Sequence, residues 1–153
     1  MKSENEPITD DEWLIRRVPI TYWRAESFPF ILPAAFRPRD KGDAPDLTGI
    51  SVHRFSCLKC LEEALAKVSA DKLGAAGLVR FSVADLKAIG WSVVPEADND
   101  DPIIPGHCVI PELSVQSYES NKQLGKLGMA TLAELASRPN CLVLVPPQLR
   151  GVV

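Results

Sequence analysis

Arginine is concentrated near the start of the chain, where lysine is scarce. A guanidinium presents a planar fork of N–H donors that matches carboxylate and phosphate groups. Arg37 and Arg39 flank Pro38 directly after Phe36, so the restricted backbone should hold both guanidinium groups in a fixed relation. The region predicts a site for an anion or an acidic partner, unless each arginine pairs with a nearby acid. The arginines are Arg16, Arg17, Arg24, Arg37, Arg39 and Arg54, and the nearby acids are Asp40, Asp43 and Asp46.

A histidine late in the chain is the candidate for proton transfer. His107 follows Pro105-Gly106 and begins a short apolar run, which would place its ring at the mouth of a pocket. Imidazole is the side chain that changes its charge near neutral pH, although a packed structural histidine is the competing interpretation. The sequence contains no Gly-x-Ser-x-Gly, no phosphate-cradling glycine loop and no His-Glu-x-x-His. No reaction class therefore follows from motifs.

The cysteines allow, but do not require, a metal site. Cys57 and Cys60 form a Cys-x-x-Cys pair, which is half of a tetrahedral zinc site. A complete site would need a histidine, His53 or His107, together with one of the two remaining cysteines. The alternative is that these thiols are small buried apolar groups. We expect no metal and no cofactor, and the Cys57/Cys60 pair stays open. The remaining cysteines are Cys108 and Cys141.

The elements that must position these groups alternate irregularly between strands and helices. Period-two or wholly apolar runs predict strands at 49–55, 77–81, 91–94, 107–110 and 141–145. Helical spacing predicts longer helices at 57–69 and 120–137, the latter with Leu124, Leu127, Leu132 and Leu135 inward and Gly125 and Gly128 allowing close packing. Ser82 to Asp85 forms a capping box for a short helix that ends at Gly90. A second box, Thr9 to Glu12, should open a short helix or an edge strand.

Between Pro19 and Pro45 the chain is rich in proline and aromatic residues, which predicts a long ordered loop packed on the core. The expected fold is therefore α+β, with a small mixed or antiparallel sheet, two longer helices and one short helix. The 153 residues fit one globular domain over 9–153, with a disordered segment at 1–8. No apolar run approaches the roughly 20 residues that span a bilayer, and no signal peptide is present, so we expect a cytoplasmic protein.

Part of the chain resembles short uncharacterised bacterial proteins. In those proteins Ser-x-Ala-Phe-Arg precedes an acidic spacer and Gly-x-Ser-Val, and here Pro33 to Arg39, an acidic turn and Gly49 to Arg54 are similar. A unit like Val79 to Val94 and a Gly-His like Gly106-His107 follow, so the resemblance covers most of residues 13–111. This sequence has alanine, Ala34 or Ala35, where serine is usual. The resemblance implies no established activity, only that the regions of Arg37, Ser51 and His107 belong to one recurring design.

These features favour a non-catalytic binding or interaction module, of a regulatory or immunity type, with a protein partner. The alternative is a small enzyme acting on a nucleotide or another phosphate-bearing substrate, with Arg37 and Arg54 clamping the anion and His107 as acid or base. A net charge of −3 disfavours nucleic acid as the partner. The expected binding residues are Trp23, Phe36, Arg37, Arg39, Ser51 and Arg54.

Overall fold

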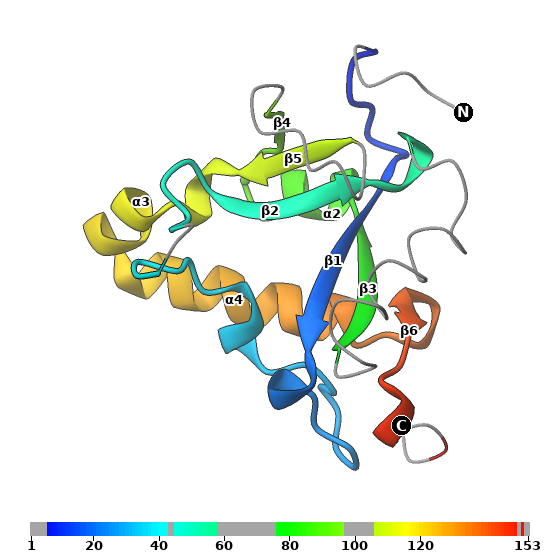
Figure 1. Cartoon of the computed structure of the whole chain (residues 1–153). Coiled ribbons are helices and arrows are strands. Elements are labelled where there is room, and N and C mark those ends of the chain that lie inside the picture. The colour runs from blue at the N-terminus through cyan, green and yellow to red at the C-terminus, as the bar shows by residue number, and fades with distance from the viewer. Residues whose placement is uncertain (1–5, 43–44, 58–75, 97–105, 150, 152–153) are drawn as a thin grey trace.

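A computed structural model of the chain describes residues 6–42, 45–57, 76–96, 106–149 and 151, and the following account refers to them. Their strands form an antiparallel six-stranded sheet in the order β4-β5-β2-β1-β3-β6 (Figure 1). The strands are β1 (Trp13–Pro19), β2 (Ile50–Arg54), β3 (Ala76–Ser82), β4 (Val94–Pro95), β5 (His107–Ile110) and β6 (Leu142–Leu144). The α+β class and an antiparallel sheet are therefore confirmed.

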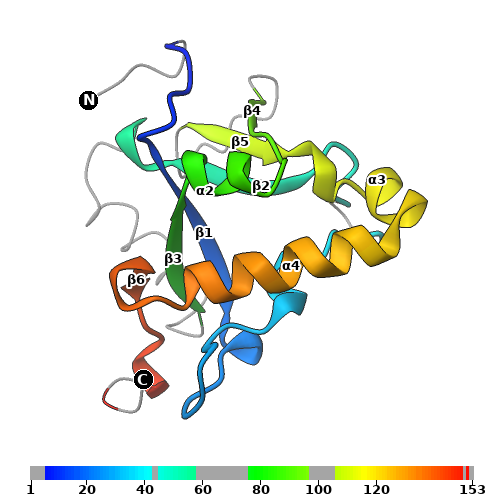
Figure 2. The same ribbon diagram turned by 180° about the vertical axis from the view of Figure 1, so that it is seen from behind.

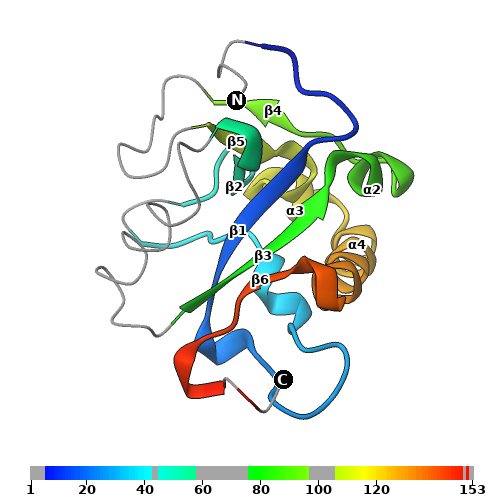
Figure 3. The ribbon, with the colours of Figure 1, turned by 90° about the vertical axis from the view of Figure 1, so that its right-hand side faces the viewer.

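Three α-helices accompany the sheet within the described residues, α2 (Val83–Ala88), α3 (Val115–Ser120) and α4 (Lys122–Ala136). Helices α2 and α4 lie on one side of the sheet (Figure 3), and α4 passes across that face (Figure 2). The core is the cluster of apolar side chains between the sheet and these helices, including Leu14, Val18, Val79, Phe81, Met129, Leu132 and Ala133. Short 3₁₀ turns complete the chain at Ile20–Tyr22, Pro33–Phe36 (η2), Phe55–Cys57, Pro111–Leu113, Pro139–Cys141 and Pro147–Leu149.

Local signals around α2 are confirmed. The Ser82 side chain accepts a hydrogen bond from the backbone N–H of Asp85 at 3.0 Å, as a helix N-cap does. Gly90 follows the helix with a φ of 81°, a left-handed conformation that glycine adopts without a steric cost. The strand expected at 91–94 is shorter and lies at Val94–Pro95, while Trp91 is buried beside α4.

Helix α4 turns a different face to the core from the one that its leucines predict. Leu124 and Leu127 were expected inward, but they are 54% and 66% exposed. A Cβ added to Gly128 would lie 2.0 Å from the Trp91 ring, and Gly125 meets a tyrosine ring in the same way. The helix packs on its glycine side because those glycines leave room for the rings, and the two leucines therefore face outward. The leucines that are inward as expected are Leu132 and Leu135.

The segment after the Thr9 box is a strand and not a helix, and it is not an edge strand. Strand β1 pairs with β2 on one side and with β3 on the other. The box itself closes a turn, in which the Thr9 N–H donates to the Glu12 carboxylate at 2.7 Å. The longer helix expected at 57–69 lies outside the described residues from 58 on, and α4 is the only helix of seven or more residues that those residues contain. Two longer helices are therefore not confirmed.

The proline-rich segment packs against the sheet. Trp23 pairs with Ile31 in an isolated bridge, and its indole N–H donates to the Val18 carbonyl at 3.0 Å. Phe36, at the end of η2, is fully buried. None of the helices in the described part of the chain is both long and apolar enough to cross a membrane.

Candidate anion-binding cleft

Strands β1 and β2 pair over a short distance and then separate. Their register contains Leu14 opposite Arg54 and Ile15 opposite His53. Beyond Ile15, β1 continues alongside β3, whereas β2 lies against β5 (Figure 1). Carbonyl groups at the point of separation lose the neighbouring strand as a partner, and a buried carbonyl without a donor is costly.

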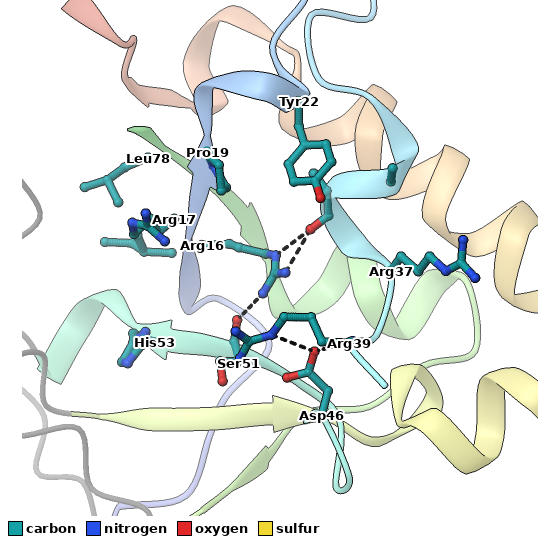
Figure 4. A pocket seen from close by; sticks show the side chains of 13 residues that line it. Arg16, Arg17, Pro19, Tyr22, Arg37, Arg39, Asp46, Ser51, His53 and Leu78 are labelled. Atoms are coloured by element: carbon teal, nitrogen blue, oxygen red, sulfur yellow. Dashed lines mark hydrogen bonds and ion pairs between the residues drawn. The ribbon is translucent and has the colours of Figure 1, made fainter. Parts of the chain in front are cut away.

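Arg16 bridges the two strands at this point. Its Nη1 donates to the Ser51 carbonyl of β2 at 2.7 Å, and its Nε and Nη2 both donate to the Ala35 carbonyl of η2, at 3.1 and 2.8 Å (Figure 4). The guanidinium also lies 5.8 Å from the centroid of the Phe36 ring. A guanidinium has five N–H donors. Three are used in these bonds, and two have no partner among the described residues.

Within the described part of the chain, Arg16 is hydrogen-bonded to carbonyl oxygens and to no carboxylate. Burial lowers the pKa of Arg16 to about 10. The carboxylate of Asp46 opposes this shift, whereas the positive charges of Arg39 and Arg17 add to it. The group is still protonated at neutral pH. It is therefore a partly buried cation, repelled by other cations and bonded to neutral oxygens.

A cleft of about 300 Å³ opens beside Arg16. Its described lining contains four arginines and a histidine but one carboxylate, that of Asp46. Apolar side chains and the Tyr22 ring form much of the remaining wall (Figure 4). The lining residues are Ile15, Arg16, Arg17, Pro19, Tyr22, Ala34, Ala35, Arg37, Arg39, Asp46, Ser51, His53 and Leu78. Positive charge thus predominates in a concave site.

Asp46 is already engaged with Arg39. The backbone N–H of Arg39 donates to Asp46 Oδ2 at 2.7 Å, and the Arg39 Nε lies 3.6 Å from the same oxygen. Asp46 is 9% exposed, but the Arg39 side chain is 66% exposed. This pair matches, for Arg39, the expectation that nearby acids neutralise the early arginines.

A serine and two histidines lie on the strands beside the cleft. His107 Nε2 is 2.9 Å from the Ser51 hydroxyl oxygen, and the His107 and His53 ring centroids are 5.2 Å apart at an interplanar angle of 45°. Ser51 and His53 line the cleft, and His107 lies opposite His53 on the neighbouring strand β5. The sequence analysis named Ser51 as a binding residue and His107 as a possible acid or base, and the fold brings the two side chains into contact.

Arg54 is not part of the cleft. Its side chain is 1% exposed, and its Nε and Nη2 donate to the two oxygens of Glu12 at 2.8 and 3.1 Å. Burial alone would raise the pKa of Glu12, but hydrogen bonds from Arg54, Thr9 and Ser56 and the charge of Arg54 together hold it at about 2. Arg54, one of the two arginines of the predicted anion clamp, is thus held in an internal ion pair.

The other predicted contact residues also occupy different places. Arg37 is exposed and points away from the cleft (Figure 4), with its guanidinium 5.6 Å from the centroid of the Tyr118 ring. Trp23 and Phe36 are in the hydrophobic core. Arg37, Arg54 and His107 therefore do not converge on one substrate, as the enzyme hypothesis requires.

Within the described residues, no group of three or more histidine, cysteine, aspartate or glutamate side chains is placed to hold a metal. Cys108 and Cys141 are buried, and burial raises the pKa of the Cys141 thiol. Cys60 lies outside the described residues, so the Cys-x-x-Cys prediction stays a prediction.

Sequence reasoning named Arg16 among six arginines but did not include it in the expected binding residues, although it lies at the centre of the cleft. One signal was present: Arg16 occupies the same set of alternating positions as Leu14 and Val18, which are core residues of the same strand. A charged residue on the apolar phase of a strand needs a buried partner or a special site. The other lining residues absent from the expected set include Arg17, Tyr22, Asp46 and His53.

Comparison with known proteins adds no functional information. No family model, no curated protein and no solved structure matches this chain.

Proposed function

We propose that this protein is a binding module for a small anionic ligand, of which a phosphate-bearing molecule is the best fit, in the cleft between β1 and β2. One observation carries the proposal: Arg16 is a partly buried cation that is bonded to carbonyl oxygens and has two N–H donors left among the described contacts. Hydrogen bonds between ionised groups are shorter and stronger than neutral ones, so an oxyanion gains more at this position than water does.

The balance of charge supports an anion. Arg16, Arg17 and Arg39 line the cleft, as does Arg37, whose guanidinium points away from it (Figure 4), and the one carboxylate in the described lining already accepts from Arg39. Burial lowers the pKa of Arg16, and the positive charges of Arg39 and Arg17 lower it further. A bound anion would relieve the repulsion between these charges, which adds to its affinity.

The size of the cleft supports a small molecule over a protein surface. A volume of about 300 Å³ is at the lower end for ligand pockets. The aromatic residues expected to anchor a protein partner, Trp23 and Phe36, are buried in the core and offer little surface to one. The alternative is an acidic protein segment that binds Arg37 and Arg39 from solvent. The experiment below must distinguish this alternative from a small anion bound in the cleft.

Binding is favoured over catalysis because the residues assigned to chemistry are dispersed. Arg54 is neutralised by Glu12, and Arg37 lies over Tyr118. Anion recognition needs only the donors that already converge at Arg16.

The test is calorimetric titration of the protein with inorganic phosphate and with a glycerol phosphate at constant ionic strength. We expect saturable binding that Arg16→Met weakens by at least tenfold, since a hydrogen bond to a charged group contributes about 1.5–3 kcal/mol. Arg24→Met is the matched control, because Arg24 is exposed and is not among the lining residues.

Two results would count against the proposal. Equal weakening by both arginine variants would indicate general charge attraction and no cleft. Binding of an acidic peptide that survives Arg16→Met but not Arg37→Met would place the function on the outer surface.

A further inference from the structure

The contact between Ser51 and His107 has a direction that the surroundings of the imidazole decide. His107 Nε2 lies 2.9 Å from Ser51 Oγ, and either atom could supply the hydrogen. The other ring nitrogen, Nδ1, is buried and has no hydrogen-bond partner among the described residues. The neutral ring carries one N–H, so the choice is which nitrogen bears it.

Placing the hydrogen on Nδ1 would bury an N–H donor with no acceptor. Placing it on Nε2 leaves Nδ1 as an unused acceptor and gives the N–H a partner, the Ser51 oxygen. Native proteins tolerate an under-used buried acceptor more often than an orphaned buried N–H. The surroundings of His107 therefore favour the Nε2–H form, in which the imidazole donates and the serine accepts.

We infer that His107 is a positioning residue that makes the Ser51 hydroxyl a hydrogen-bond donor to the anion in the cleft. This inference rests on the proposed function. Once Ser51 Oγ accepts from His107, its own hydrogen is left for another acceptor, and no described residue accepts it. Ser51 lines the cleft, and its carbonyl is bonded to Arg16. The hydroxyl hydrogen and the unused Arg16 donors thus become available to one ligand.

The histidine pair explains why the ring keeps this orientation. His53 and His107 are opposite each other on β2 and β5, and their rings pack at 5.2 Å between centroids. The flanking ring limits rotation of the His107 imidazole, so Nε2 stays directed at Ser51. The assignment also opposes a nucleophilic role for Ser51, because activation of its hydroxyl requires Nε2 to accept the proton.

The first test is the nitrogen-15 NMR spectrum of histidine-labelled protein, which distinguishes the two neutral forms directly. The chain has two histidines, so His107→Gln assigns both rings. We expect a protonated Nε2 and an unprotonated Nδ1 in the neutral ring of His107, with or without ligand. A protonated Nδ1 would overturn the inference regardless of whether any anion binds.

The second test is phosphate titration of Ser51→Ala, His107→Leu and His107→Gln. Loss of a donor to an anion predicts roughly tenfold weaker binding for Ser51→Ala. His107→Leu should weaken binding several-fold, and His107→Gln should restore most of it because its amide can still donate to Ser51. Full affinity in Ser51→Ala, or equal affinity in His107→Leu and His107→Gln, would overturn the inference while phosphate binding and its dependence on Arg16 stand.

A fluorophosphonate probe separates donation from catalysis. We expect no covalent labelling of Ser51 by mass spectrometry. Labelling that disappears in His107→Gln would overturn the assignment, because it requires His107 to accept the serine proton. If wild-type protein binds no phosphate, the proposed function fails instead, and the NMR result still decides the direction of the Ser51–His107 bond.

Discussion

Two arginines on neighbouring strands, Arg54 on β2 and Arg16 on β1, are bonded to different kinds of partner. Both occupy alternating positions of their strand whose other side chains belong to the core. Arg54 is 1% exposed and bonded to both oxygens of Glu12. Arg16 is half-buried and bonded to the carbonyls of Ala35 and Ser51.

The difference separates a structural cation from a cation available to a ligand. The Glu12–Arg54 pair is neutral as a unit, and Thr9 and Ser56 donate further hydrogen bonds to the carboxylate. At Arg16 the bonded oxygens carry no net charge, so the site as a whole stays positive. Burial of an arginine therefore says little about function until its counter-charge is known.

The largest effect should come from breaking the Glu12–Arg54 pair. Removing one partner of a buried ion pair leaves an uncompensated charge and costs about 3–5 kcal/mol. We expect Glu12→Gln and Arg54→Met each to lower the free energy of unfolding by that order in urea denaturation. The double variant should be more stable than Arg54→Met alone. If Glu12→Gln, Arg54→Met and the double variant all lower the free energy of unfolding by the same small amount, the ion pair does not stabilise the fold.

Acid should act on the same pair. The folded pKa of Glu12, about 2, is below its ordinary value of 4.5, so its contribution is complete above about pH 4.5 and is lost as pH falls through 2. The shift corresponds to about 3 kcal/mol. Urea denaturation between about pH 6 and pH 2 should show a steeper loss of stability for the wild type than for Glu12→Gln. Parallel curves would contradict the low pKa.

Arg16→Met should cost less stability, about 1–2 kcal/mol. The carbonyls of Ala35 and Ser51 lose their donor, but the variant no longer has to bury a charge that lacks a bonded carboxylate. Phosphate should raise the melting temperature of the wild type and leave that of Arg16→Met unchanged. If Arg16→Met lowers the free energy of unfolding as much as Arg54→Met does, Arg16 is a structural cation and not one available to a ligand.

The smallest effect should come from Ser56→Ala, which removes one of the hydrogen bonds to Glu12 at 2.8 Å. We expect a loss of about 1 kcal/mol and a higher pKa for Glu12, measured by carboxyl NMR titration. Ser120→Ala, an exposed hydroxyl on α3, serves as the control and should leave that pKa unchanged.

Local features of this fold could be predicted from the sequence, and long-range ones could not. The Ser82 cap and the turn at Gly90 depend on neighbouring residues, and both are confirmed. The outward direction of Leu124 depends on Trp91, a ring from a distant segment that fills the space beside Gly128. Helical periodicity predicted the helix but could not identify the side with the closer neighbour.

The candidate site shows the same limit. Arg54 was expected in a clamp because strand alternation does not reveal that Glu12, 42 positions away, lies against it. Arg16 was one cation among six because no local pattern shows where β1 and β2 separate. Contacts of this kind depend on strand order, which these short apolar runs leave undetermined.

The most direct test compares both arginines in one experiment. Nitrogen-15 NMR at low temperature should resolve the Nε–H resonances of buried arginines, which can be followed during titration with inorganic phosphate. We predict saturable movement of the Arg16 resonance while the Arg54 resonance stays in place. Movement of both to the same extent, or of neither, would contradict the assignment of the cleft as an anion site.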